Sequence, residues 1–234
     1  MTSPLSIVLV PGLLCSARLF AEQLPALSAI GTTTIADTTR DASIEDFAQR
    51  LLADAPPRFA LAGLSMGGYI AFEVMRRAPE RVAKLALLDT SARADTPTQI
   101  LRREALVALA EESGLPAVVE QLFPLYVAPA RRDDAALRAL VDQMALEIGK
   151  AAFAGQEVAI ARRHDSRPTL RTIACPTLVL VGEDDQATPP ELSAEIADAI
   201  PAAQRVTVPA CGHLSTLEQP AAVTAALVAW LGTT

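Results

Sequence analysis

Short runs of apolar residues alternate with longer amphipathic, alanine-rich segments along most of the chain. Apolar runs of this length are typical of strands that are buried on both faces of a parallel sheet. Amphipathic segments between them indicate helices that connect one strand to the next. The pattern predicts strands at residues 6–10, 33–36, 59–63, 84–88, 177–182 and 205–208, with helices at 19–30, 44–55, 67–77, 191–200 and 221–231.

One long segment departs from this alternation. Between residues 97 and 163 there is helical periodicity without a convincing strand, interrupted near Gly114, Pro129 and Gly149. The βα pattern resumes at Cys175, so the segment is an insertion and not a separate domain. The sequence therefore predicts a core of residues 1–95 and 165–234, into which a helical cap of residues 96–164 is inserted.

Composition narrows the classes of partner. Half of the 234 residues are hydrophobic and the net charge is −7, with arginines dispersed along the chain. Nucleic acid needs clustered cations and is excluded as a partner. The three cysteines are an odd number with no closely spaced pair, which favours a reducing compartment over a disulfide framework. The first residues lack the positive charge with which a signal peptide begins. No apolar run is long enough for a membrane span. A cytoplasmic protein is expected, and the sequence does not determine its oligomeric state.

The strongest chemical signal is the pentapeptide Gly63-Leu64-Ser65-Met66-Gly67, between a predicted strand and a predicted helix. A serine on such a sharp turn needs flanking glycines, because neighbouring backbone passes close to it. Its hydroxyl then stands at the carboxyl edge of the sheet beside a helix N-terminus, where negative charge is stabilised. A chance match in a turn is the weaker interpretation, and Ser65 is predicted to be a nucleophile.

A serine hydroxyl requires a general base, and the chain has two histidines. His213 follows the last predicted strand, at the same sheet edge as Ser65, and is the predicted base. His164 lies at the end of the helical insertion and is interpreted as a surface residue. The base needs an acid to orient it, and three acids follow the strand at 177–182. Asp185 is the first choice, with Asp184 and Glu183 as alternatives.

Two backbone N–H groups should stabilise the oxyanion. One is expected from Met66, directly after the nucleophile, and the other from Leu13, in the loop after the first strand. No metal or organic cofactor is predicted, because two distant histidines and scattered cysteines give no ligand spacing.

These segments resemble the α/β-hydrolase superfamily over the whole chain. The resemblance lies in Pro11-Gly12-Leu13-Leu14, in the elbow around Ser65, in the loop at residues 182–190 and in residues 212–220. In that family the acid stands three residues after the glycine that ends its strand, which is Asp185. The resemblance implies an α/β-hydrolase fold with a mostly parallel six-stranded sheet in the order 2-1-3-4-5-6, flanked by helices and covered by an all-helical cap.

The segments around Asp185 and His213 are also similar to 3-oxoadipate enol-lactonases. The family usually has His-Gly where this chain has Pro11-Gly12, which leaves the proton transfers intact but the substrate less defined. Serine at the elbow separates the chain from haloalkane dehalogenases and epoxide hydrolases of similar plan, which carry aspartate there.

The expected activity is hydrolysis of a carboxylic ester with a small or medium acyl group, through an acyl-enzyme. An enol-lactonase, a carbon–carbon bond hydrolase and a cofactor-free perhydrolase remain alternatives, since they use the same three side chains. A binding protein that kept the fold is disfavoured because each catalytic position is filled. An anionic lactone would need arginines at the pocket, with Arg93, Arg162, Arg163 and Arg167 as candidates. The expected partner is a small ester or lactone, and the candidate lining residues are Leu14, Phe123, Tyr126, Met144, Phe153 and Arg162.

Overall fold

The computed structural model describes residues 5–201 and 203–233. Within them six strands form one sheet in the order β2-β1-β3-β4-β5-β6, and every neighbouring pair is parallel. This is the predicted order, which the structure confirms. The strands are β1 (Ser6–Val10), β2 (Thr33–Ile35), β3 (Phe59–Leu64), β4 (Val82–Leu88), β5 (Thr177–Gly182) and β6 (Gln204–Val208).

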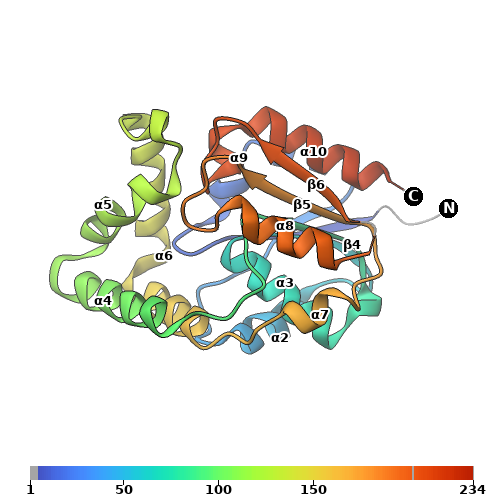
Figure 1. Ribbon diagram of the computed structural model, residues 1–234, viewed down its shortest axis with the longest axis horizontal. Coiled ribbons are helices and arrows are strands. Elements are labelled where there is room, and N and C mark those ends of the chain that lie inside the picture. The colour runs from blue at the N-terminus through green and yellow to red at the C-terminus, as the bar shows by residue number, and fades with distance from the viewer. Residues whose placement is uncertain (1–4, 202, 234) are drawn as a thin grey trace.

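Helices cover both faces of the sheet, as expected for right-handed crossovers between parallel strands (Figure 1). On one face α1 packs against α10, and on the other α2 and α7 pack against α3, with α8 beside α7. The apolar sides of these helices complete a continuous core on the sheet. Their bounds are α1 (Leu24–Ser28), α2 (Ile44–Asp54), α3 (Met66–Arg77), α7 (Arg167–Leu170), α8 (Pro190–Ala199), α9 (Ser215–Glu218) and α10 (Pro220–Gly232).

The helix expected at residues 19–30 is wrong as a single element. The structure has a 3₁₀ turn, η1 (Ala17–Phe20), followed by the separate short helix α1. Pro25 lacks a backbone N–H, so it fits the first turn of a helix and not its interior. Gln23 lies between the two pieces with its side chain buried, donating to the carbonyl of Thr216 at 3.0 Å. A tertiary contact therefore interrupts the local periodicity.

The inserted helices α4 (Pro97–Ser113), α5 (Leu115–Tyr126) and α6 (Ala135–Ala161) lie between β4 and β5, which confirms the helical insertion. Gly114 and Gly149 have positive φ angles of 84° and 78°; the first separates α4 from α5, and the second kinks α6. Figure 1 shows α4, α5 and α6 together at one end of the molecule. We call these three helices the cap.

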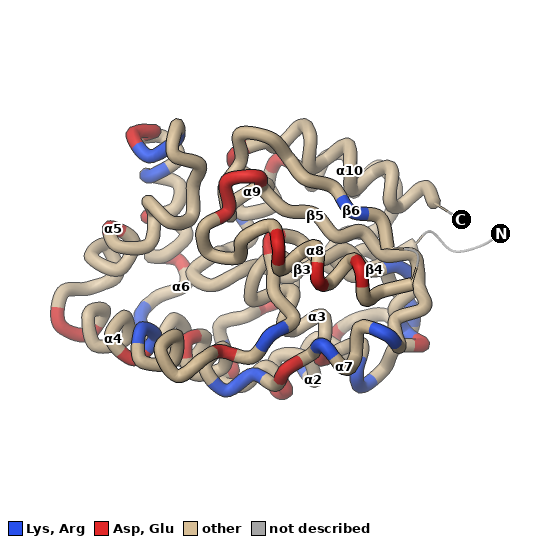
Figure 2. Tube along the Cα trace, in the orientation of Figure 1, with Lys and Arg blue, Asp and Glu red and all other residues tan. Residues whose placement is uncertain are grey.

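Charged residues are concentrated outside the central strands of the sheet. The strands β1, β3 and β5 are uncharged, and charged residues gather on the helices and outer loops (Figure 2). Two further 3₁₀ turns, η2 (Pro79–Arg81) and η3 (Pro129–Arg131), connect elements at the surface. In the described part of the chain, none of the helices combines the length and hydropathy that a membrane span requires.

Candidate active site

Ser65 occupies the sharp turn between β3 and α3, with φ of 55°. Backbone in this region is strained for a non-glycine residue, at a cost of about 1–3 kcal/mol. Three hydrogen bonds hold the turn: Ser65 N–H donates to the carbonyl of Leu88 at 2.9 Å, and the Ser65 carbonyl accepts from Gly68 N–H and from Thr90 Oγ1, each at 2.8 Å. A Cβ on Gly67 would overlap the carbonyl oxygen of Val10. The glycine thus lets the helix start pass against β1.

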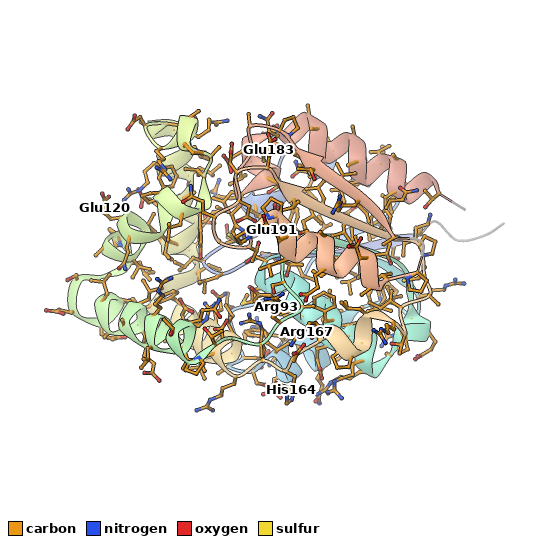
Figure 3. All side chains as sticks on the ribbon, in the orientation of Figure 1. Arg93, Glu120, His164, Arg167, Glu183 and Glu191 are labelled. Atoms are coloured by element: carbon orange, nitrogen blue, oxygen red, sulfur yellow. The ribbon has the colours of Figure 1, made fainter. Side chains whose placement is uncertain are left out.

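His213 lies in the loop between β6 and α9, and its side chain is buried. Its Nε2 is 2.9 Å from Ser65 Oγ. The ring of Tyr126, at the end of α5, stands beside the imidazole with 5.1 Å between ring centroids. His164 is exposed and pairs with Glu45 at 3.1 Å. In Figure 3 it lies at the bottom of the view, whereas Glu183, directly after β5, lies at the top. Of the two histidines, only His213 reaches Ser65.

Asp185 completes a row of three hydrogen-bonded side chains, with His213 in the middle and Ser65 at the other end. Its Oδ2 accepts from His213 Nδ1 at 2.8 Å and from the Thr188 hydroxyl at 2.8 Å. Its Oδ1 accepts from the N–H groups of Ala187 and Thr188, each at 2.9 Å. All four bonds go to a carboxylate that is 3% exposed, so both oxygens are fixed in position. Such a carboxylate holds the imidazole with a proton on Nδ1 and with Nε2 free to accept from the serine.

The electrostatics of His213 favour a base that can carry a proton briefly. Burial alone would lower the pKa of the imidazole, but the charge and hydrogen bond of Asp185 outweigh burial and raise the pKa above its ordinary value. The carboxylates of Asp89 and Glu218 act in the same direction. The protonated imidazolium is therefore stabilised at the point where a proton taken from Ser65 would reside.

Two residues at the start of α3 and after β1 have N–H groups without a hydrogen-bond acceptor in the described part of the chain. Met66, the first residue of α3, and Leu13, in the loop after β1, are buried, and neither N–H donates a hydrogen bond to any residue within 5–201 or 203–233. The first N–H of a helix has no acceptor within the helix and Leu13 lies in a loop, so both groups are available to donate to an oxyanion. Gly12, the neighbour of Leu13, lies against the nucleophile, because a Cβ there would lie 3.3 Å from Ser65 Cβ.

A small apolar cavity of about 10 Å³, which is room for about one water molecule, lies between the loop after β1 and the cap. Its lining brings together three of the six expected lining residues, Leu14, Phe123 and Tyr126, with Leu13 of the expected oxyanion hole. The structure does not bring the others there. Met144 and Phe153 are fully buried in the packing of α6, and Arg162 is exposed beside a hollow between α4 and α6.

Three of the four candidate arginines have carboxylate partners. Arg93 and Arg167, which lie near each other in Figure 3, both contact Glu195, at 3.0 and 3.9 Å. Arg163 is buried, pairs with Asp95 at 2.6 Å and stacks on the ring of Tyr69. A second hollow of about 340 Å³ beside Thr188 is lined by three arginines, but each of them is paired with a carboxylate. Little uncompensated positive charge is left for an anionic substrate.

Comparison with known proteins decides the family. The family model described as alpha/beta hydrolase fold matches residues 37–220. This chain belongs to the α/β hydrolase fold family. Its structure superposes on an esterase from Thermogutta terrifontis, solved with malate bound, with a TM-score of 0.89 and 30% identity over 98% of this chain and 90% of the esterase. It superposes equally well, at 26% identity over 100% and 93%, on the enol-lactonase of Burkholderia xenovorans LB400.

A sequence relative of this α/β hydrolase has a different kind of name. BpoC of Mycobacterium tuberculosis, named provisionally as a non-heme bromoperoxidase, is 32% identical and aligned over 88% of this chain and 86% of its own. Esterase, lactonase and peroxidase names thus occur among proteins similar to this α/β hydrolase. The family is shared among them, and the substrate has to be argued from the site.

Sequence reasoning about this α/β hydrolase missed two buried acids beside His213. Glu218 accepts from Gly212 N–H at 3.0 Å and from Ala128 N–H at 2.7 Å, so it joins the histidine loop to the cap. Asp89, directly after β4, accepts from Gly182 N–H at 2.9 Å and from the Ser215 hydroxyl. Burial raises the pKa of both carboxyls. Glu218 could have been noticed, because it is the glutamate of the run that resembles enol-lactonases.

Proposed function

We propose that this α/β hydrolase cleaves carboxylic esters with a small or medium acyl group, in two steps through an acyl-enzyme. The single observation that carries the proposal is the continuous row from Ser65 Oγ through the His213 imidazole to the Asp185 carboxylate, with contacts of 2.9 and 2.8 Å. Nucleophile, base and orienting acid are thereby within hydrogen-bonding distance in the order that acyl transfer needs.

In the first step Ser65 Oγ attacks the ester carbonyl carbon while His213 Nε2 takes the hydroxyl proton. The carbonyl electron pair moves onto oxygen, which accepts from the N–H groups of Met66 and Leu13. Asp185 stabilises the imidazolium formed at this stage. When the tetrahedral intermediate collapses, the carbon–oxygen bond to the leaving group breaks and His213 returns its proton to the departing alkoxide.

In the second step water replaces the alcohol. His213 Nε2 takes a proton from the water as its oxygen attacks the acyl carbon, and the oxyanion again rests on the N–H groups of Met66 and Leu13. Collapse breaks the bond to Ser65 Oγ, which recovers its proton from the imidazolium. The products are a carboxylic acid and an alcohol, and the protein returns to its starting state without any added group.

The apolar lining of the cavity favours a small, uncharged acyl group. Its lining includes Leu13, Val119, Leu122 and Phe123. An apolar group bound against these side chains is stabilised because its surface is removed from water. An enol-lactone of a dicarboxylate would have to compete with Glu195 and Asp95 for the nearby arginines. We therefore place the ester ahead of the enol-lactone, which the likeness to the Burkholderia enzyme keeps as the second candidate.

We also assign the cap to residues 96–164 and the core to residues 1–95 and 165–234. The partner of the site is a small ester or lactone. Carbon–carbon bond hydrolysis and perhydrolysis would use the same three side chains.

The test is a screen of wild-type protein against p-nitrophenyl esters of increasing acyl length and against matched neutral and anionic lactones. We expect the highest kcat/KM for short, neutral esters, and a preference for anionic lactones would instead support the enol-lactonase. Ser65→Ala and His213→Ala should abolish hydrolysis. His164→Ala is the matched control and should retain it, because His164 contacts Glu45 and not the row. Full activity in Ser65→Ala would refute the proposal.

A fluorophosphonate probe gives a second measurement that does not depend on the substrate. An activated serine becomes covalently labelled, so Ser65 should be modified in the folded wild-type protein and spared in His213→Ala. A folded protein that fails to label would indicate a binding module that kept the fold.

A further inference from the structure

One buried side chain of the cap reaches the loop that carries Leu13. Gln156, in the second half of α6, is fully buried. Its Oε1 accepts from the N–H of Leu14 at 3.0 Å, and its Nε2 donates to the carbonyl of Thr38 at 2.9 Å. The amide is satisfied at both ends, so its orientation is fixed by its partners.

The loop that it contacts is a tight, strained turn. Cys15 N–H donates to the carbonyl of Gly12 at 3.2 Å, which closes a four-residue turn with Leu13 and Leu14 at its centre. Leu14 has φ of 57°, a conformation that glycine or asparagine normally supplies in such a turn. A leucine keeps this conformation only where the surroundings impose it.

The surroundings hold one peptide unit from both sides. Between Leu13 and Leu14, the N–H of the peptide donates to Gln156 Oε1, and its carbonyl accepts from Cys15 Sγ at 3.3 Å. Rotation of this peptide is the movement that would relax the positive φ of Leu14. The Gly12–Leu13 peptide, which carries the unpaired N–H of Leu13, is joined to the held peptide at the Leu13 Cα and belongs to the same turn, so fixing the Leu13–Leu14 peptide limits how far that N–H can move when the turn loosens.

We propose that Gln156 is a positioning residue for the oxyanion hole: it holds the Leu13–Leu14 peptide so that the Leu13 N–H points at the oxygen that becomes charged. The inference rests on the proposed ester hydrolysis and extends it, because it assigns a part in the reaction to a residue of the cap. The cap then does more than shape the acyl cavity. Its seating on the core determines whether the second oxyanion donor is in place.

The bond from Gln156 to Leu14 is not needed merely to attach α6. Glu147, in the first half of the helix, accepts from the Ser16 hydroxyl at 2.6 Å and pairs with Arg18 at 2.6 Å. Gly155 lets the helix pass closely over the Asp41 carbonyl, which a Cβ would approach to 2.9 Å. With α6 anchored at these points, the hydrogen bond to Leu14 acts on the turn.

The decisive variant is Gln156→Met, which keeps the volume and removes both hydrogen bonds. An oxyanion contact strengthens as the transition state forms, so its loss lowers kcat and leaves KM nearly unchanged. We expect kcat for p-nitrophenyl acetate to fall by about 10- to 100-fold, short of the loss of a whole donor. Glu147→Ala is the matched control, since it removes a bond between α6 and the core that does not touch Leu14.

Two results would overturn the inference. Wild-type kcat in a folded Gln156→Met protein would show that the turn at residues 12–15 keeps its conformation without Gln156. Equal losses of kcat in Gln156→Met and Glu147→Ala would show that any loosening of α6 has the same effect, and that the contact with Leu14 is not specific.

Gln156→Glu tests the inference independently of stability. A buried, unpaired glutamic acid stays protonated to higher pH, with documented pKa values of about 8–9. In that form its carbonyl oxygen can accept from Leu14 N–H and its hydroxyl can donate to the Thr38 carbonyl, as the glutamine amide does. We expect kcat within about threefold of wild type at the pH optimum of the variant. Ionisation leaves an acceptor for Leu14 N–H but sets a negative charge against the Thr38 carbonyl, which displaces the side chain and should add an alkaline loss of kcat near pH 8 that wild type lacks. Matching pH profiles in the two proteins would contradict the inference.

These outcomes can be distinguished from failure of the proposed function. If Ser65→Ala retains the activity, the ester hydrolase itself is refuted. If Ser65→Ala is inactive while Gln156→Met matches wild type, the hydrolase stands and only the role of Gln156 is refuted.

Discussion

Replacing Asp185 with asparagine should disable the base through its tautomer while leaving the fold intact. The geometry determines how the new amide sits. Oδ1 of Asp185 accepts from two backbone N–H groups, those of Ala187 and Thr188, each at 2.9 Å. An asparagine must keep its carbonyl oxygen there, because an NH₂ group would meet two donors. Its NH₂ group then takes the place of Oδ2, facing His213 Nδ1.

An NH₂ group at that place can only donate to Nδ1, so Nδ1 becomes an acceptor and the ring proton moves to Nε2. In this structure His213 Nε2 lies 2.9 Å from Ser65 Oγ. Once Nε2 carries a proton, it cannot take the proton of the Ser65 hydroxyl. The loss that follows from the wrong tautomer is about 10⁴-fold in kcat. That factor corresponds to about 5.5 kcal/mol of transition-state stabilisation.

The assay is steady-state hydrolysis of p-nitrophenyl acetate, with circular dichroism and thermal unfolding to establish that the variant folds. Asp184→Asn is the matched control, since it makes the same chemical change one residue away and Asp184 has no side-chain hydrogen bond to His213 among the described contacts. A folded Asp185→Asn protein with more than about a tenth of wild-type kcat would refute the tautomer argument. Comparable losses in both variants would refute the choice of acid.

Three further outcomes are expected. Because the pKa of His213 is raised above 6.5 and the neutral ring is the active form, kcat/KM should rise with pH through a midpoint above 6.5; a lower midpoint would contradict the dominance of Asp185 over burial. Glu218→Gln keeps only one good acceptor for two buried N–H groups, so urea denaturation should show a loss of about 1–3 kcal/mol, and unchanged stability would argue against the bridge. Gly67→Ala should fail to fold stably because its Cβ overlaps the Val10 carbonyl, whereas Gly232→Ala, whose Cβ would meet nothing within 4 Å, should unfold like wild type.

Much of the fold could be read from the order of short apolar runs, because parallel strands buried on both faces leave an unambiguous pattern. The helix expected at residues 19–30 failed because its interruption depends on Gln23 reaching Thr216, a contact nearly two hundred residues away in sequence. Local periodicity carries no information about such a partner. The breaks at Gly114 and Gly149 were visible, since positive φ selects for glycine.

The candidate site divides in the same way. Ser65 and His213 carry local signals, a turn flanked by glycines and a position after the last strand, and the structure has them 2.9 Å apart. Their catalytic roles, like that of Asp185, stay predictions for the variants above. Gln156 carried no signal at all: a glutamine in a helix is ordinary, and only the folded chain brings it to the N–H of Leu14. Phe153 and Met144 show the reverse, because aromatic and sulfur side chains in a cap fill its packing as readily as a pocket.

The bridge made by Glu218 has a consequence for protein engineering. The carbonyl of Tyr126 accepts from Leu214 N–H at 3.1 Å, and the N–H of Ala128 donates to Glu218, so the end of α5 is bonded directly to the loop that holds the histidine. A cap transplanted from a relative to alter substrate choice would strand these buried groups unless its own loop supplied the same donor and acceptor, at about 1–3 kcal/mol for each group left unpaired. In this scaffold, the cap and the histidine loop should be exchanged as one module.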